Sequence, residues 1–341
     1  MILSKILLFP YYITLKIRNR LYDKGKMKTY SWETPVICIG NVTAGGTGKT
    51  PMTEYAVRLY SQHCRVAVLS MGYKRKGKGF MLVKPEDTAD MVGDEPLQIK
   101  RKFPNVTVAI DRNRKRGIDN LLALVDKPDV ILLDDAFQRR EIIPSKTIFL
   151  VDYNRPIFKD QLLPLGHLRD LPEQIRRADA VVVTKFPEYH SEWDCEKLRK
   201  LTRIKPGQEI YFSKIRYCQP KPVFEQYGDN RYIYSKSAYL FTGVANPRPL
   251  QEWLCGSYDE IATAKFQDHH KYTAADIFRI RVYAEKNPLC ILLTTEKDAQ
   301  RLRNNRFITE AMKVRMFYVP IEVEFLNGDE TKRFNDYLLE N

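Results

Sequence analysis

A glycine-rich segment, GNVTAGGTGKTP at residues 40–51, constrains the fold of this chain more than any other feature of its sequence. An apolar run precedes it, and apolar positions recur with helical spacing in the residues that follow it. The glycines at 45, 46 and 48 let the backbone curl so that successive N–H groups point at phosphate oxygens. Lys49 is placed to neutralise β- and γ-phosphate charge, and the Thr50 hydroxyl to bind Mg²⁺. The segment therefore predicts a nucleotide-binding loop between a strand and a helix.

The loop departs from the common pattern, GxxxxGK followed by Ser or Thr, because Thr43 stands where that pattern has its first glycine. We interpret the segment as a variant loop, GGTGKT. Its context supports this interpretation, because a phosphate-binding loop lies between a strand and a helix. The residues predicted to bind the nucleotide are Thr43, Ala44, Gly45, Gly46, Thr47, Gly48, Lys49 and Thr50.

Strand-like and helix-like segments alternate up to about residue 208. Apolar runs such as VAVLS, VILLD, IFLVD and AVVVT are separated by helical stretches such as NRKRGIDNLLALVDK. This alternation predicts an α/β fold of the P-loop NTPase type, with a mostly parallel sheet and helices on both faces. Polar residues end the strands, as expected where ligands bind at the carboxyl edge of such a sheet.

The pattern changes near Glu209, where Tyr, Phe, Ile and Val become frequent and turn signals appear at Pro220, Pro222 and Gly228. We interpret this stretch as a β-ribbon linker that leads into a smaller C-terminal α/β lobe. The predicted division is an N-terminal membrane-interface segment at 1–28, a P-loop kinase domain at 29–208, the linker at 209–237 and the C-terminal lobe at 238–341.

The N-terminal segment carries an apolar and aromatic run, MILSKILLFPYYITL, followed by basic residues. The run is shorter than the about 20 apolar residues of a spanning helix. It also lacks the charge order and the small-residue cleavage site of a signal peptide. Aromatic residues at headgroup level and basic residues on anionic lipid predict a segment lying in the membrane interface. The alternative is an ordinary helix docked on the protein's own core.

The formal net charge of +14 favours a negatively charged partner: nucleotide, nucleic acid or anionic lipid. No nucleic-acid-binding module accompanies the basic stretches YKRKGKG at 73–79 and DRNRKRG at 111–117, so we predict no nucleic-acid partner. These stretches are either a solvated surface or a place for a phosphorylated lipid. The six cysteines include no CxxC pair, which favours a reduced, intracellular setting.

Three polar clusters follow strands or turns. Asp134 and Asp135 end an apolar strand, where P-loop proteins place the acid that holds Mg²⁺; a strand-end cap is the alternative. In LLPLGHLRD, Arg169 is suited to neutralise charge on a transferred phosphoryl group. In GDEP, Asp94 and Glu95 set two carboxylates in a turn, for which the simpler interpretation is the first turn of a helix.

A histidine pair, His269 and His270 in FQDHHKYT, is the last candidate group. Adjacent histidines suggest a metal, but no further ligands follow at suitable spacing. We therefore favour a general base or an orienting histidine that faces the cleft, with a surface pair as the alternative. The segment TTEKDAQRL at 294–302 is consistent with a purely structural role.

Together these motifs resemble the tetraacyldisaccharide 4'-kinase family, the lipid A 4'-kinases of Gram-negative bacteria. Other P-loop families share the loop but not the series. The likeness runs in the family's order from about residue 35 to 275 and is carried by GNVTAGGTGKTP, SMGYKRKGKG, GDEP, DR at 111–112, DDAFQRR, LLPLGHLRD, TGVANP and FQDHHKYT.

The resemblance implies transfer of the γ-phosphate of ATP, with Mg²⁺, to the 4'-hydroxyl of a tetraacylated glucosamine disaccharide 1-phosphate. The product would be the 1,4'-bisphosphate lipid A precursor. The resemblance also implies work at the lipid surface of the inner membrane, on its cytoplasmic face, and we expect no obligate protein partner.

The resemblance makes Asp94 the base that takes the proton of the sugar hydroxyl, with His269 as its partner. The residues expected to act are the catalytic groups Asp94, His269, Lys49 and Arg169, the metal ligands Thr50, Asp134 and Asp135, and the substrate-binding residues Tyr73, Glu95 and Gln138.

Three motifs depart from the family's usual form: DDAFQRR stands for DDGFQH, SMGYK for SRGYG, and LLPLGHLRD for LLPAGPLRE. These changes put in question any role at Met71 or Arg139, and they leave the loop, Asp94 and His269 untouched. Two other function classes stay open. One is a membrane-localised regulatory ATPase of the partitioning type. Ala44 counts against it, because that class has its signature lysine at this position. The other is a nucleic-acid-binding P-loop protein, which only the net charge favours.

Overall fold

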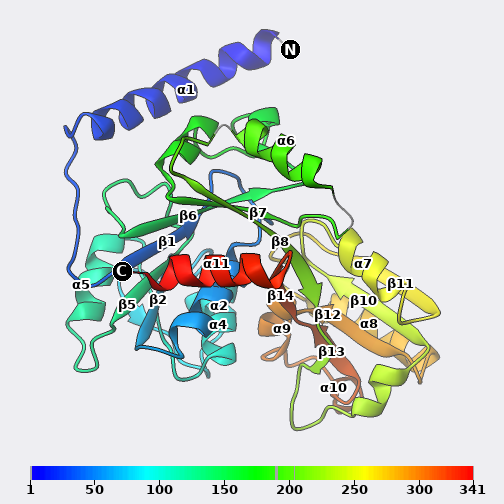
Figure 1. Ribbon diagram of the computed structural model, residues 1–341. Coiled ribbons are helices and arrows are strands. Elements are labelled where there is room, and N and C mark those ends of the chain that lie inside the picture. The colour runs from blue at the N-terminus through cyan, green and yellow to red at the C-terminus, as the bar shows by residue number, and fades with distance from the viewer. Residues whose placement is uncertain (1, 189–190, 203, 341) are drawn as a thin grey trace.

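The computed structural model describes residues 2–188, 191–202 and 204–340. Two sheets organise this part of the chain (Figure 1). In the nine-stranded sheet, all neighbours from β8 to β4 run parallel, and β14 and β3 are antiparallel edges. This confirms the predicted α/β class. The order is β14 (Ile321–Phe325), β8 (Glu209–Tyr217), β7 (Ala180–Thr184), β6 (Lys146–Asp152), β1 (Val36–Gly40), β5 (Val130–Asp134), β2 (Val66–Ser70), β4 (Thr107–Ile110) and β3 (Met81–Leu82).

Both faces of the central strands are covered, which explains their unbroken apolar runs. Along β1, Ile37 and Ile39 pack into one core, and Val36 and Cys38 pack into the other. The first core is covered by α2 (Lys49–Tyr60), α4 (Asp94–Lys102) and α11 (Gly328–Leu339). The second core is covered by α5 (Arg114–Leu122), α6 (Glu192–Thr202) and the 3₁₀ helix η2 (Pro172–Arg177). The remaining short helices of this part are α3 (Ala89–Val92) and η1 (Ile157–Lys159).

The five-stranded sheet forms a second, smaller α/β layer. Its order is β11 (Glu260–Lys265), β10 (Ser237–Thr242), β12 (Ile291–Thr295), β13 (Met316–Val319) and β9 (Lys221–Pro222). One face packs on α8 (Ala274–Lys286), α9 (Glu296–Leu302) and α10 (Glu310–Lys313), and the other on α7 (Arg248–Leu254). The 3₁₀ helix η3 (Asn230–Tyr234) precedes β10.

The division between the sheets differs from the predicted boundaries at two places. Strand β8, which was assigned to the linker, pairs in parallel with β7 and so belongs to the first sheet. The chain also returns to that sheet after β13, because β14 pairs antiparallel with β8 and α11 covers the first core. Apolar alternation reveals a strand but does not say which sheet edge it joins, so the sequence could not show this return.

The N-terminal helix α1 (Ile2–Asp23) lies along the outside of the nine-stranded sheet (Figure 1). Leu15 is buried in the core, and the Asn19 side chain donates a 2.9 Å hydrogen bond to Asp170. Phe9 and Ile17 nevertheless remain 61% and 55% exposed. One side of α1, with Leu15 and Asn19, thus docks on the protein, and Phe9 and Ile17 remain uncovered. Among the described residues, no helix combines the length and the apolarity needed to cross a bilayer.

Candidate active site

The phosphate loop joins β1 to α2 and takes the curled backbone that its glycines permit. Gly45, Gly46 and Gly48 have φ of 74°, 43° and 86°, a region that residues with a Cβ rarely adopt. A methyl group added at Gly45 would meet no atom within 4 Å, and at Gly46 it would meet only the Lys185 ammonium at 3.9 Å. The curled segment is therefore open on the side where a phosphate group would approach.

The back of the loop is held by the segment LLPLGHLRD. The Ala44 N–H donates to the His167 carbonyl at 2.7 Å, and the Arg169 N–H donates to the Val42 carbonyl at 2.6 Å. Thr43 is buried and bridges to Leu168. Thr43 and Ala44 therefore fix the loop's position, and in this structure the Ala44 N–H is already engaged. The later loop residues are the ones left for phosphate.

Lys49, Asp135 and Arg169 meet beside the loop. The Arg169 guanidinium donates to both carboxylate oxygens of Asp135, at 2.6 and 2.8 Å, and to the Asn41 side-chain oxygen at 2.9 Å. The Lys49 ammonium is 3.9 Å from Asp135. Burial alone would raise the pKa of Asp135, but Lys49 and Arg169 hold it below its usual value. Burial lowers the pKa of Lys49. Two cations therefore flank one ionised carboxylate, ready for an anionic ligand.

Asp134 has a different environment, although it is the next residue. Asp134 is 4% exposed, and its carboxylate accepts hydrogen bonds from two hydroxyl groups, from Thr53 at 3.2 Å and from Ser70 at 3.4 Å. Burial, with the charges of Asp135 and Glu95, raises the pKa of Asp134 to about 6. No described lysine or arginine forms an ion pair with it within 4.0 Å. A buried carboxylate without a direct cation partner fits a Mg²⁺ ligand, as does the Thr50 hydroxyl in the first turn of α2.

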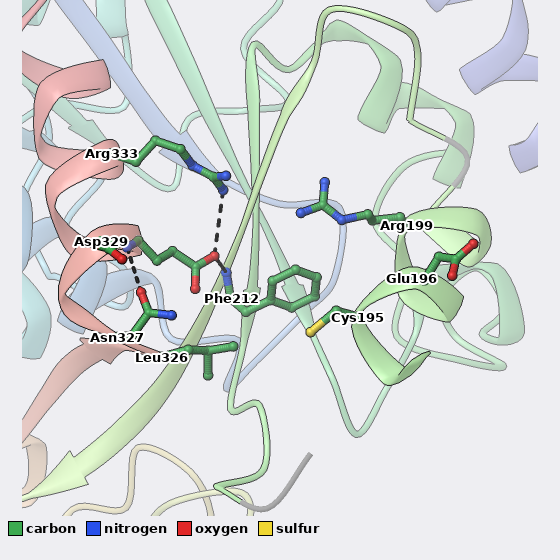
Figure 2. Close-up of a pocket in the computed structure, with 9 residues that line it drawn as sticks. Cys195, Glu196, Arg199, Phe212, Leu326, Asn327, Asp329 and Arg333 are labelled. Atoms are coloured by element: carbon green, nitrogen blue, oxygen red, sulfur yellow. Dashed lines mark hydrogen bonds and ion pairs between the residues drawn. The ribbon is translucent and has the colours of Figure 1, made fainter. Parts of the chain in front are cut away.

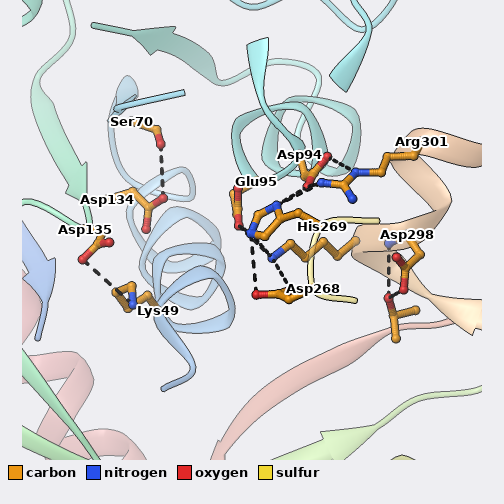
Figure 3. Close-up of polar contacts among 12 residues, drawn as sticks. Lys49, Ser70, Asp94, Glu95, Asp134, Asp135, Asp268, His269, Asp298 and Arg301 are labelled. Atoms are coloured by element: carbon orange, nitrogen blue, oxygen red, sulfur yellow. Dashed lines mark hydrogen bonds and ion pairs between the residues drawn. The ribbon is translucent and has the colours of Figure 1, made fainter. Parts of the chain in front are cut away.

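Asp94 and His269 form a pair that joins the lobes of the two sheets (Figure 3). Asp94 begins α4, and His269 Nδ1 lies 2.8 Å from its Oδ2. Arg301, on α9, donates to both Asp94 oxygens, at 2.7 Å to Oδ1 and more closely to Oδ2. Burial tends to raise the pKa of Asp94, but hydrogen bonds from His269 and Arg301 lower it below the usual value. Asp94 is thus held as a buried, ionised carboxylate.

A second group of charges surrounds the other nitrogen of His269. The Lys297 ammonium is 2.9 Å from His269 Nε2, 3.1 Å from Glu95 and 3.6 Å from Asp268. The Tyr73 ring meets the His269 ring edge-on, with 5.2 Å between ring centres. Glu95 also connects the two halves of the cleft, because its charge favours protonation of both Lys49 and Asp134. The phosphate loop and the Asp94–His269 pair therefore face one site.

The comparisons with known proteins agree with this arrangement. A family model described as tetraacyldisaccharide-1-P 4'-kinase matches residues 2–341. The chain belongs to this family. It is 40% identical over 342 residues to the tetraacyldisaccharide 4'-kinase of Bacteroides thetaiotaomicron, covering 96% of this chain and 90% of that protein. It is 40% identical over 337 residues to the Flavobacterium johnsoniae protein of that name, covering 96% and 95%.

A solved structure of the tetraacyldisaccharide 4'-kinase family shares the whole fold. The crystal structure of LpxK from Aquifex aeolicus, described as an "apo" form in complex with ATP, has a TM-score of 0.75 and 27% sequence identity, and the match covers 100% of both chains. Both the nine-stranded sheet and the smaller second sheet are therefore part of the likeness.

Two residues that contact Asp94 and His269 in the candidate site, Lys297 and Arg301, were missed by the sequence analysis, which treated TTEKDAQRL as structural. They lie four residues apart, so they share one face of α9, and that face points at Asp94 and His269. The spacing is visible in the sequence, but which face of α9 meets the cleft is not. Gln138, which was predicted to bind substrate, lies beside the loop: its side-chain amide donates to the Asn41 main-chain carbonyl, and its main-chain carbonyl accepts from Arg18 at 2.6 Å.

The basic stretch DRNRKRG is mostly structural in this kinase. Arg114 is fully buried and donates to the Asp134 carbonyl at 2.8 Å, and Arg116 pairs with buried Asp111 at 2.8 Å. These contacts hold the strand end that carries the two acids. In YKRKGKG, Arg75 is buried and the lysines are exposed.

A separate cavity of about 690 Å³ lies between α6 and the start of α11 (Figure 2). Arg199, Arg333 and Glu330 are among its lining residues, and Arg333 is 3.8 Å from Glu330. None of the predicted site residues lines it. This cavity is therefore separate from the candidate site.

Proposed function

We propose that this chain transfers the γ-phosphate of ATP to the 4'-hydroxyl of an acylated glucosamine disaccharide 1-phosphate, giving the 1,4'-bisphosphate lipid A precursor. One observation carries this proposal: the Asp94–His269 pair faces a phosphate loop whose cations are in place. A loop alone would serve any nucleotide-hydrolysing protein. The buried carboxylate opposite it adds a group able to accept a proton from an alcohol.

The phosphate loop suits ATP. Gly45 and Gly46 leave the loop open, and Lys49 and Arg169 supply positive charge at its edge. Asp135 shields these two cations from each other until a phosphate arrives. Asp134 and Thr50 are the residues that would hold Mg²⁺, which when bound neutralises phosphate charge. The protein's own contribution is positioning and charge neutralisation, which are the main needs of phosphoryl transfer.

In the transfer step, the oxygen of the sugar hydroxyl forms a bond to the γ-phosphorus. The bond between that phosphorus and the β,γ-bridging oxygen breaks, and ADP leaves with its electron pair. The hydroxyl proton passes to the Asp94 carboxylate. His269 and Arg301 hold that carboxylate in one orientation, so that it is ionised and aimed before the acceptor arrives. Tyr73 and Glu95 lie beside the pair, where the acceptor sugar would enter.

The acceptor is a lipid, so the enzyme must meet it at a bilayer. We infer that α1 lies in the membrane interface at the cytoplasmic face of the inner membrane. Phe9 and Ile17 are exposed on it, and Tyr11 and Tyr12 are partly exposed. The Tyr11 hydroxyl donates to the Arg169 carbonyl at 3.0 Å. The same helix would thus touch the membrane and the segment that holds the phosphate loop.

We also propose a division of labour between the lobes. Residues 29–217 and 321–340 would bind the nucleotide, and residues 218–320 would bring His269, Lys297 and Arg301 to the cleft.

The proposed function is tested by transfer of labelled γ-phosphate from ATP to a tetraacyldisaccharide 1-phosphate in mixed micelles with Mg²⁺. We expect a labelled lipid, and none with the Lys49→Ala chain. Label released only as free phosphate would support a regulatory ATPase and contradict the proposal.

A further inference from the structure

The side of α1 that faces the protein is held by a set of polar contacts. Asn19 is 3% exposed, and its side chain donates to Asp170 at 2.9 Å. The main-chain carbonyl of Asn19 accepts from Arg140 at 2.9 Å. Arg18 donates to the Gln138 carbonyl at 2.6 Å and lies 3.8 Å from Asp170. Two neighbouring residues of α1 therefore each contact both of the motif segments DDAFQRR and LLPLGHLRD.

Asp170, in the second of these segments, is a fully buried carboxylate. Its Oδ1 accepts from Asn19 and from the main-chain N–H of Leu171, at 2.9 and 2.8 Å. Its Oδ2 has no hydrogen-bond partner among the described residues, and Arg18 is the cation of its ion pair. A buried carboxylate that loses its partners is strongly unfavourable. Removal of the α1 contacts would therefore displace Asp170 from its position.

Asp170 directly follows Arg169, whose main chain is held from two directions. The Arg169 N–H donates to the Val42 carbonyl at the phosphate loop, and the Arg169 carbonyl accepts from the Tyr11 hydroxyl of α1 at 3.0 Å. The Arg169 side chain then reaches Asp135 beside the loop. A guanidinium that must meet a phosphate oxygen is sensitive to small displacements of its main chain. The α1 contacts thus lie where they can set the position of this guanidinium.

The segment DDAFQRR connects α1 to the same place. The Gln138 carbonyl accepts from Arg18, and the Gln138 side-chain amide donates to the Asn41 carbonyl. The Asn41 side chain accepts from Arg169 at 2.9 Å and donates to the hydroxyl of Thr47, in the phosphate loop, at 2.5 Å. The two series of contacts that begin on α1 therefore meet at Asn41, between Arg169 and the loop.

We propose that α1 is a positioning element of the kinase site, and that Asn19 and Arg18 orient Arg169 toward the γ-phosphate. They do so by fixing the two motif segments relative to each other, and they act through Arg169 instead of binding the nucleotide. This role is separate from membrane contact, which the proposed function gives to the exposed side of the helix. The inference rests on the proposed role of Arg169 at the γ-phosphate, but not on the identity of the acceptor.

The affinities for ATP and for ADP, each with Mg²⁺, test this inference on the full chain without membrane or acceptor. Because the two nucleotides differ by the γ-phosphate, the ratio of their dissociation constants reports on contacts to that phosphate. Arg169→Ala should lower the preference for ATP over ADP about tenfold or more, since a charge-assisted contact is lost. Asn19→Ala and Arg18→Gln should each lower it about three- to tenfold. Arg20→Gln, at an exposed position of α1, is the control and should leave the preference unchanged.

The combination of Asn19→Ala with Arg169→Ala separates positioning from general stability. If Asn19 acts through Arg169, the double variant should have the same preference as Arg169→Ala alone, within about twofold. Equal weakening of ATP and ADP in Asn19→Ala, or a further loss of preference in the double variant, would overturn the inference. An unchanged preference in Arg169→Ala would refute the proposed role of Arg169, and the inference with it.

A second measurement uses the unaltered chain and so does not depend on how a variant folds. Coupling between two sites is reciprocal, so if docking of α1 favours ATP binding, ATP must favour docking of α1. Hydrogen exchange in peptides that cover residues 11–23 should therefore be slower with ATP and Mg²⁺ than with ADP and Mg²⁺, by about threefold or more. Equal exchange with the two nucleotides would contradict the inference and leave the proposed transfer to a lipid untouched.

Discussion

His269 Nδ1 lies 2.8 Å from Asp94 Oδ2, although the two residues are 175 positions apart and belong to different lobes. Arg301 binds the same carboxylate from a third segment. The proposed proton acceptor, Asp94, therefore has these hydrogen-bonding partners only when the two lobes are packed together.

Replacement of His269 by Ala should lower kcat about 10²–10⁴-fold and leave the KM for ATP nearly unchanged, because a proton-transfer partner is lost and the phosphate loop is not. Transfer of labelled phosphate to the lipid acceptor measures this. The neighbouring His270 supplies a matched control, because its ring pairs with Asp276 at 2.9 Å, away from Asp94. His270→Gln should stay within about threefold of the natural chain; an equal loss in both variants would refute the role of His269.

Replacement of Arg301 by Gln should shift the pH dependence of kcat/KM. The variant removes hydrogen bonds and a positive charge that lower the pKa of Asp94, and it leaves the burial that raises it. The pKa of Asp94 therefore rises. Because Asp94 accepts a proton only when ionised, the acid limb of the profile should move to higher pH, by about 1–2 units. Arg303→Gln, nearby in the chain, is the control. Loss of activity at every pH, with an unmoved limb, would show that Arg301 only stabilises the fold.

Glu296 should make the protein's stability depend on pH. Burial and the charge of Glu54 raise the pKa of Glu296 to about 7, despite the Lys102 ammonium 3.1 Å away. Between about pH 4.5 and 7 the folded state then holds a proton that the unfolded state releases, so the free energy of unfolding falls as pH rises.

Urea unfolding of the natural chain and of Glu296→Gln at pH 5 and pH 8 measures this contribution. The variant should lose less stability between these pH values, by about 1–3 kcal/mol. Glu310→Gln, at an exposed position on α10, should behave like the natural chain. Parallel pH dependence in Glu296→Gln and the natural chain would contradict the assignment.

The exposed side of α1 should bind membranes. Phe9→Glu with Ile17→Glu places charge on that side and leaves the buried Leu15 and Asn19 contacts intact. Co-sedimentation with anionic vesicles should fall about tenfold or more, while ATP binding is retained. Tyr234→Glu, at an 85% exposed aromatic in the second lobe, is the control. Unchanged sedimentation of the double variant would exclude α1 as the membrane contact.

Local features of the sequence were enough to predict the fold class and the phosphate loop. Apolar runs such as VILLD report burial on both faces of a parallel sheet, and the glycines at 45, 46 and 48 report a backbone that only they adopt easily. The motif series was enough to identify the family. The short strand β4 was not among the predicted strands. It has only four residues, TVAI, and so short a segment shows too little periodicity to be recognised as a strand.

Contacts between distant segments were decided by the tertiary structure alone. The sequence contains Lys297 and Arg301 on one helical face and Asp94 at a helix start, but nothing local states that α9 packs against α4. The return of β14 to the first sheet is of the same kind, because strand pairing depends on which edge is free. The sequence thus determined the phosphate loop and the strands around it, since neighbouring residues shape them. Only the folded chain decided what faces that loop, since the facing groups are brought together by the packing of two lobes.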